Sequence, residues 1–323
     1  MRTDAVAPVI AVMLILAIAV TFYSAWNALV IPSMKQTAEV EHLRNVESAF
    51  RHFSSDITYA ASSHQNHLSF SEPVELGGGD VILDTVRSAG GLSVGEDSLS
   101  VYNLILYNIS PDNQNEIEKA RVDGTIINIA YEPVGNFWQD QGYRYQEGYI
   151  NVTKYNRALQ TPLGYYNMTD VTNDMSDPRG TIATFAQSFG EVSYRNTTPD
   201  YCSNLTLLAV NITVSPDHRF VSSNGFGMLK LVSNVTKITL NNDIQIVSIG
   251  SGQDNQDFFG RAAFNSWKNG LDEAASVCKD NIYLDPSYSP DENPSRYLLK
   301  PKEPDQSSPT VTIENVAIEV SAY

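Results

Sequence analysis

The histidines are the residues of this sequence best suited to acid–base chemistry, and they are few and scattered. Of the five in the chain, His42, His52, His64 and His67 fall in or just after a stretch with helical periodicity. His218 lies alone in the remainder, so a Ser-His-Asp hydrolase would have to use it. An ectoenzyme is therefore the weakest of three functional hypotheses, and we expect no enzymatic activity.

Metal and nucleotide sites have equally little support. His64 and His67 are spaced i, i+3 and could share a metal, but no third ligand lies near them in the sequence. The oxygen-rich segments 112–116 and 254–257 lack the glycine and the distant glutamate of an EF-hand loop, so turns explain them better than calcium does. Neither a Gly-x-Gly-x-x-Gly motif nor a Walker loop occurs. We expect no cofactor and no metal.

The two cysteines, Cys202 and Cys278, allow a single pairing. In an oxidising compartment such a pair is commonly bridged, whereas in a reducing one both would be small core residues. Their spacing fits neither a zinc site nor a redox Cys-x-x-Cys motif. We expect a disulfide, because the features below place this part of the chain outside the cell.

Asn-x-Ser/Thr sequons are moderately more frequent than chance predicts, which also favours surface exposure. They occur at Asn108, Asn151, Asn167, Asn196, Asn204, Asn211 and Asn234. Sequons inside strands, such as the one at Asn211, are expected to be used less than sequons in turns.

The amino-terminal segment is apolar for long enough to cross a bilayer. No charged residue occurs from Ala5 to Met34, and about 20 apolar residues span the hydrocarbon core. Tyr23 and Trp26 suit the far membrane–water interface. A signal-peptidase site at Ala17-Ile18-Ala19 would lie inside the apolar run, so retention of the helix is favoured over cleavage. We expect the amino terminus in the cytoplasm and the bulk of the chain outside.

A second helical stretch follows, and Pro32 is expected to kink or interrupt the helix between the two. Its apolar residues recur at intervals of three and four, on one seam of a helix. They are Leu43, Val46, Phe50, Phe53 and Ile57. This seam could pack on the chain's own domain or against copies of itself, and two heptads do not decide between these alternatives.

The hexamer Val6-Ala7-Pro8-Val9-Ile10-Ala11, with the aliphatic run after it, resembles the amino-terminal segment of archaeal type IV pilin-like proteins. Ala7 and Ala11 stand where that family typically has serine and glycine, and the resemblance covers roughly 30 of the 323 residues. It implies processing on the cytoplasmic side, around Thr3, Asp4 and Ala5. It also implies a retained helix that assembles a filament core, with Val6, Pro8 and Ala11 at its start and the seam residues extending it.

From residue 68 onward the pattern is predominantly β. Short alternating segments separated by turn signals predict strands over 98–106, 124–131, 142–152, 181–189, 205–214, 228–232, 235–240, 244–249 and 310–320. One helix is predicted at about 257–278. The fold class is therefore mainly β with a long amino-terminal α-helix. Residues 1–67 form the leader, membrane or filament-core helix and stalk, and residues 68–323 form an extracellular, sandwich-like domain with one packed helix.

The surface chemistry limits the partners. A net charge of −16 disfavours nucleic-acid binding and favours solubility at high salt. Tyr143, Tyr145 and Tyr149 alternate along one predicted strand face, which could bind a partner or, more commonly, stabilise the sheet.

Two hypotheses follow from these features. The first is a structural, adhesive subunit of an archaeal type IV pilus-like filament, which associates with the membrane and then with further copies through its amino-terminal helix. The second is a membrane-tethered surface protein that binds a glycan or protein ligand and never polymerises. Both place the chain at the cell surface, anchored in the cytoplasmic membrane or assembled into a filament.

Overall fold

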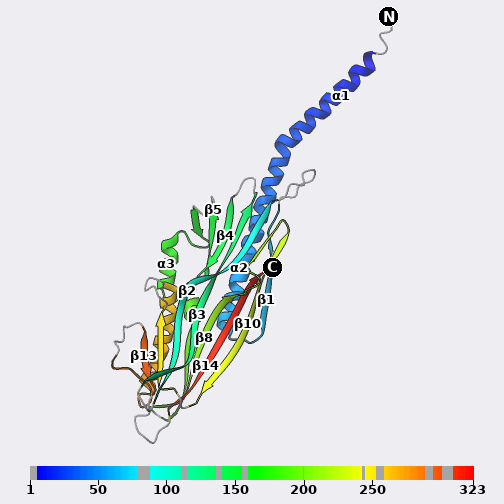
Figure 1. Cartoon of the computed structure of the whole chain (residues 1–323). Coiled ribbons are helices and arrows are strands. Elements are labelled where there is room, and N and C mark those ends of the chain that lie inside the picture. Colours follow the sequence, from blue (N-terminus) through cyan, green and yellow to red (C-terminus); the bar gives the residue numbers. More distant parts are fainter. Residues whose placement is uncertain are drawn as a thin grey trace.

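A continuous helical rod opens the chain and joins it to a β-rich body. The computed structural model describes residues 6–78, 88–110, 115–135, 140–154, 159–198, 200–241, 244–251, 258–287, 294–299 and 308–323. The rod consists of α1 (Val6–Ala25), the π-helical turn η2 (Trp26–Val30) and α2 (Ile31–Ser63). Figure 1 shows α1 projecting away from the body and α2 running into it.

The helical rod is not broken at Pro32, and the expected disturbance of the α-helix takes the form of a π-helical turn. Pro32 lies in the first turn of α2, and the π-helical turn comes directly before it, with the Ile31 N–H bonded to the Trp26 carbonyl. A wider turn relieves the clash between a proline ring and the preceding carbonyls, so the rod continues through a local change of pitch.

Two sheets form the body, as the alternating sequence pattern predicts. The first has the order β1 (Leu68–Glu75), β10 (Phe226–Leu240), β14 (Thr310–Ala322), β8 (Tyr201–Val214) and β7 (Gly190–Thr198). The second has the order β12 (Tyr283–Leu284), β13 (Ser295–Leu298), β11 (Ile246–Ser251), β2 (Ala89–Ile109), β3 (Glu116–Val134), β4 (Gln141–Gln146), β5 (Tyr149–Lys154) and β6 (Leu159–Pro162). A short strand, β9 (Phe220–Ser223), also pairs with β2.

The carboxyl-terminal strand lies inside the first sheet, as predicted. It is antiparallel to β10 and parallel to β8. The two sheets face each other where β8 contacts β3, and side chains join them directly. The Tyr102 hydroxyl donates to the Val210 carbonyl at 2.8 Å, and the Thr125 hydroxyl donates to the Ile212 carbonyl at 2.8 Å.

Helices fill the two sides of this sandwich. The stalk α2 contacts β1 and β10 of the first sheet and β4 and β5 of the second. On another side, α5 (Phe258–Val277) contacts β7, β2 and β11, close to the predicted bounds of 257–278. The Trp267 ring of α5 is 1 % exposed and packs so closely on Gly190 that a Cβ there would meet the ring nitrogen. Glycine is therefore the residue that allows α5 to approach β7.

The predicted strand over 181–189 is wrong. Its first seven residues form α4 (Thr181–Gln187), and α3 (Met168–Ser176), which the sequence pattern did not indicate, precedes it. In α4 the buried residues Ile182, Phe185 and Ala186 have helical spacing. The Asp174 carboxylate accepts from the Thr181 and Ile182 N–H groups and so satisfies the first donors of the helix.

Two other strand assignments also change. The predicted pair 228–232 and 235–240 is the single strand β10, and 142–152 is a hairpin that turns at Glu147-Gly148. The turn places Tyr149 opposite Gln146, hence on the other sheet face from Tyr143 and Tyr145. Those two tyrosines are each 1 % exposed. The predicted tyrosine face is therefore core packing and does not form a binding surface.

Candidate functional site

The most prominent candidate site is the bare apolar surface of α1. Every described side chain from Pro8 to Ala25 is exposed, including Leu16 at 61 % and Phe22 at 68 %. The 20 residues of α1 extend about 30 Å, which matches the hydrocarbon thickness of a bilayer. A helix that is apolar all round is stable only when lipid or protein covers it.

Within the described residues, one helix is long and apolar enough to span a membrane, and it is this one. The residues that were expected to mediate self-assembly lie partly in α1 and partly in α2. Val6, Pro8 and Ala11 belong to α1, and the side chains of Pro8 and Ala11 are exposed. The expected processing positions Thr3, Asp4 and Ala5 lie outside the described residues.

The seam of α2, in contrast, belongs to the core of the body. Leu43, Val46, Phe50, Phe53 and Ile57 are each at most 3 % exposed. They pack on the chain's own sheets, with the Phe50 ring 6.0 Å from that of Tyr143. A continuation of the assembly surface along this seam is therefore wrong, because its apolar side chains are already covered. The expected division at residue 67 follows the change from helix to strand, but α2 packs as part of the body.

A buried polar junction lies near the end of the body from which α1 emerges. Lys35, Glu39 and His42 follow one side of α2 and are each at most 5 % exposed. His42 Nε2 is 2.9 Å from the Tyr131 hydroxyl on β3, and His42 Nδ1 is 3.7 Å from Glu75 Oε2 on β1. The junction thus ties the stalk to both sheets.

The electrostatics of this junction favour neutral His42. Burial lowers the pKa of His42 below its ordinary value, while the carboxylates of Glu75 and Glu39 oppose that shift. Gly78 lies against the imidazole so closely that a Cβ there would be 2.9 Å from the ring. Sequence periodicity placed His42 on the helix, but no pattern in the sequence predicted its contacts with β1 and β3.

This arrangement predicts a loss of stability in mild acid. Below a pH of about 6.5 the unfolded chain protonates His42, whereas folded His42 resists protonation, so the free energy of unfolding should fall as pH drops from 7.5 to 5. Urea unfolding of the parent and of His42→Gln across this range measures the effect, and the variant should have a flatter pH profile.

His52→Gln is the matched control, because its side chain is 67 % exposed and 3.3 Å from Glu72. We expect this variant to retain the parent's profile. Equal slopes for the parent and His42→Gln would show that His42 does not set this pH dependence.

The disulfide is formed as predicted and ties α5 to β8. Cys202 and Cys278 are bonded, with their Cα atoms 5.4 Å apart. Asn281 reinforces the link, because its side chain accepts from the Cys202 N–H at 3.2 Å and donates to the Cys202 carbonyl at 2.7 Å. Both sulfur atoms belong to fully buried residues.

The seven sequons differ in accessibility. Four asparagines are exposed, namely Asn167, Asn196, Asn204 and Asn234, while Asn108 and Asn211 are partly buried and Asn151 is 0 % exposed. Asn211 Oδ1 accepts from the Thr125 N–H at 3.2 Å and from its hydroxyl, so it connects the two sheets. The folded body therefore leaves Asn151 inaccessible to modification and engages Asn211 in a structural contact.

Two features that suggest enzymes in the sequence do not form a catalytic site. A Gly-x-Ser-x-Gly pattern occurs at residues 91–95, but Ser93 lies within β2, paired with Ala130, and not at a strand-to-helix turn. His218 stacks on Tyr323 with ring centroids 4.1 Å apart, and no hydrogen bond joins His218 to Ser93. Among the described residues, no three metal-ligating side chains cluster, and His64 and His67 both adopt positive φ at the end of the stalk.

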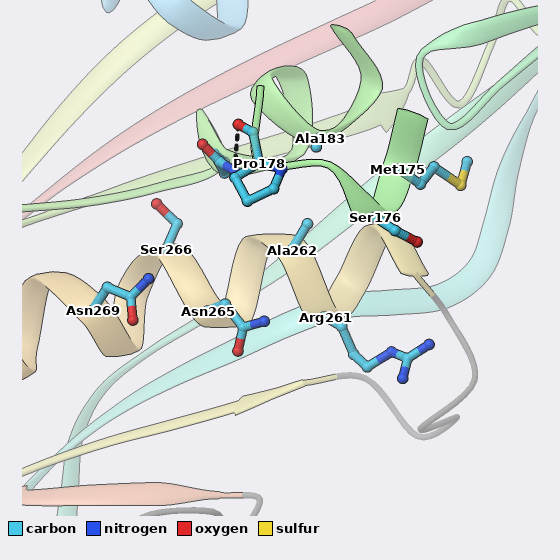
Figure 2. Close-up of a pocket in the computed structure, with 10 residues that line it drawn as sticks. Met175, Ser176, Pro178, Ala183, Arg261, Ala262, Asn265, Ser266 and Asn269 are labelled. Carbon is cyan, nitrogen blue, oxygen red and sulfur yellow. Dashed lines mark hydrogen bonds between the residues drawn. The ribbon is translucent and has the colours of Figure 1, made fainter. Parts of the chain in front are cut away.

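A polar groove lies between α5 and the α3–α4 pair, in a region for which the sequence predicted a strand. Its cavity volume is about 740 Å³, and Figure 2 shows the residues that line it. Ala262 and Ser266 point from α5 toward Pro178 and Ala183. The i, i+4 repeat of polar residues on α5 was the available signal for this groove.

Comparisons with protein families, with curated proteins and with solved structures find no match to this chain.

Proposed function

We propose that this protein is a subunit of a type IV pilus-like surface filament. In this proposal α1 anchors the subunit in the cytoplasmic membrane until assembly and then packs in the filament core. The observation that carries the proposal is the exposure of every described side chain of the apolar, charge-free α1 on a chain whose α2 is built into the body. In this proposal the continuous helix joins the filament-core segment to the body without a break.

The compartment follows from the same proposal. The disulfide between Cys202 and Cys278 favours an oxidising environment, and exposed sequons such as Asn204 and Asn234 suit a surface protein. The resemblance of residues 6–11 to pilin-like segments adds the expectation that a short leader is removed. Pro8 already lies in the first turn of α1, which begins at Val6, and its missing N–H costs no hydrogen bond there.

Two measurements test the proposal directly. Mass spectrometry of purified surface filaments should detect this chain, and sequencing of its mature amino terminus should give Asp4 or Ala5. Absence from the filaments under expressing conditions, together with an intact Met1, would contradict the proposal.

The substitution Ala11→Leu should separate membrane insertion from assembly. Leucine adds apolar surface, so insertion should be retained, whereas its bulk at a small-residue position should hold neighbouring helices apart. We expect at least a tenfold lower fibre yield at matched membrane levels, measured by electron microscopy and quantitative blotting of sheared filaments.

Ala17→Leu is the matched control for that experiment. It makes the same chemical change about 120° around the helix from Ala11. It should insert equally well and give a higher fibre yield than Ala11→Leu. A parental fibre yield from Ala11→Leu would count against assembly through this helix face.

The groove beside α5 favours a second candidate function, a membrane-tethered binding protein that does not polymerise. Its volume falls within the range of small-ligand sites. Release of the native chain by detergent as a monomer, with no fibres on the cells, would favour this alternative.

A further inference from the structure

The groove between α5 and α3–α4 is organised along the helix axis. Arg261, Asn265 and Asn269 are spaced i, i+4 and i+8, so they form one polar row along α5. Figure 2 shows this row beside the Ala262 and Ser266 side chains, which face Pro178 and Ala183. The groove therefore combines a row of long polar groups with a floor of small side chains.

The two asparagines of this row have unused hydrogen-bonding capacity. Within the described chain, the carboxamides of Asn265 and Asn269 make no hydrogen bond, whereas Ser266 donates to the Gly190 carbonyl at 2.7 Å. On the other wall of the groove, the Gln187 side-chain amide donates to the Pro178 carbonyl at 3.3 Å. The side-chain oxygen of Gln187 remains as an acceptor. Each free carboxamide presents two N–H donors and one oxygen acceptor.

The described lining favours a neutral polar ligand over a cation. Although the whole chain has a net charge of −16, no aspartate or glutamate is among the described residues that line this groove. The nearest acidic residues on the α3 side have structural roles. Asp174 caps α4 and accepts from the Tyr165 hydroxyl at 3.2 Å, while Asp177 Oδ1 accepts from the Arg179 N–H at 3.0 Å.

We propose that this groove binds an oligosaccharide, with the carboxamides of Asn265 and Asn269 as its principal contacts. Adjacent sugar hydroxyls are both donors and acceptors, and they complement a row of amides better than an apolar ligand or a metal ion would. The apolar parts of Met175, Pro178 and Ala262 can contact the C–H faces of a sugar ring. This inference holds equally for a filament subunit and for a tethered monomer.

An oligosaccharide could reach the groove from two sources with the same chemistry. One is a glycan attached to an exposed sequon of a neighbouring copy, such as Asn204 or Asn234. The other is a polysaccharide of another cell or surface. The experiment therefore uses two sets of probes, glycans released from the protein itself and a panel of unrelated neutral and acidic oligosaccharides.

The test titrates both sets of probes into the purified full-length chain in detergent micelles. Saturation-transfer NMR and calorimetry measure the binding. We expect at least one oligosaccharide to bind, and the double variant Asn265→Leu/Asn269→Leu to weaken that binding at least tenfold. Both asparagines are exposed and lie within a helix, where leucine has the higher propensity, so the variant should fold. The midpoint of thermal unfolding of the double variant, compared with that of the parent, checks that the variant is folded.

Asn173→Leu is the matched variant, because Asn173 is an exposed asparagine of α3 outside the lining. It should bind within twofold of the parent. Preference for the released glycans would identify a neighbouring copy as the source, and preference for the panel would identify a foreign surface. The proposal is overturned if no probe binds the parent at millimolar concentration, or if the double variant binds as the parent does.

Discussion

Replacing Cys202 and Cys278 together with alanine is expected to lower the free energy of unfolding by about 4 kcal/mol. The disulfide closes a loop with a sequence separation of 76 residues, and the loss of loop-closure entropy in the unfolded chain scales with the logarithm of that length. Both cysteines are 0 % exposed, so the folded state holds the link inside the core between β8 and α5.

Urea unfolding monitored by tryptophan fluorescence measures this change, since Trp267 is buried on α5 and reports on unfolding of the body. The parent chain treated with a strong reductant is the internal control and should unfold close to the double alanine variant. Asn281→Ala, which keeps the disulfide but removes its two flanking hydrogen bonds, should cost less than loss of the disulfide. An unchanged midpoint in reductant would refute a stabilising role for the disulfide.

Replacing Phe50 with alanine should destabilise the body by about 3–5 kcal/mol, the usual cost of removing a buried aromatic ring. Phe50 is 2 % exposed and packs near Tyr143, whose hydroxyl donates to the Leu43 carbonyl at 3.1 Å. The cavity would open where α2 meets β4, and the stalk would lose a main anchoring contact.

Arg51→Ala is the matched control, because Arg51 is the next residue on α2 and its side chain is 54 % exposed. Its ion pair with Glu47, at 3.1 Å, is an exposed helical pair that contributes at most about 0.5 kcal/mol. A loss of less than about 1 kcal/mol in Phe50→Ala would mean that the α2 seam is not an integral part of the core. If the α2 seam instead mediated self-association, Phe50→Ala would show this small loss of stability together with a lower fibre yield.

Several features could be predicted because they depend on local composition. The charge-free run before Lys35 indicated an exposed apolar helix, and the spacing of Ala263, Trp267 and Leu271 indicated α5. The prediction of a strand over 181–189 was wrong because a short apolar segment can form either a buried strand or a buried helix. The four buried residues of α4 form two adjacent pairs three residues apart, which is helical spacing, and the helix depends on the Asp174 carboxylate, which lies seven residues before Thr181.

The candidate groove was harder to anticipate than the helix. Its polar row on α5 is visible as an i, i+4 repeat, but exposed polar residues on one side of a helix are ordinary solvent-facing residues. Only the placement of α3 and α4 against α5 turns that row into the wall of a cavity. Likewise, the accessibility of a sequon depends on the sheet face, which is why Asn151 is buried and Asn204 is exposed.

The sequence by itself determined the apolar α1, the mainly β body and the pairing of its two cysteines, because each follows from residue type, period or count. Only the tertiary structure decided what covers each apolar face. The α2 seam packs on its own sheets while α1 remains bare, and His42 meets Glu75 and Tyr131 from strands distant in the sequence. Periodicity specifies which face of an element is apolar, but the partner of that face is set by long-range packing, which no short stretch of sequence encodes.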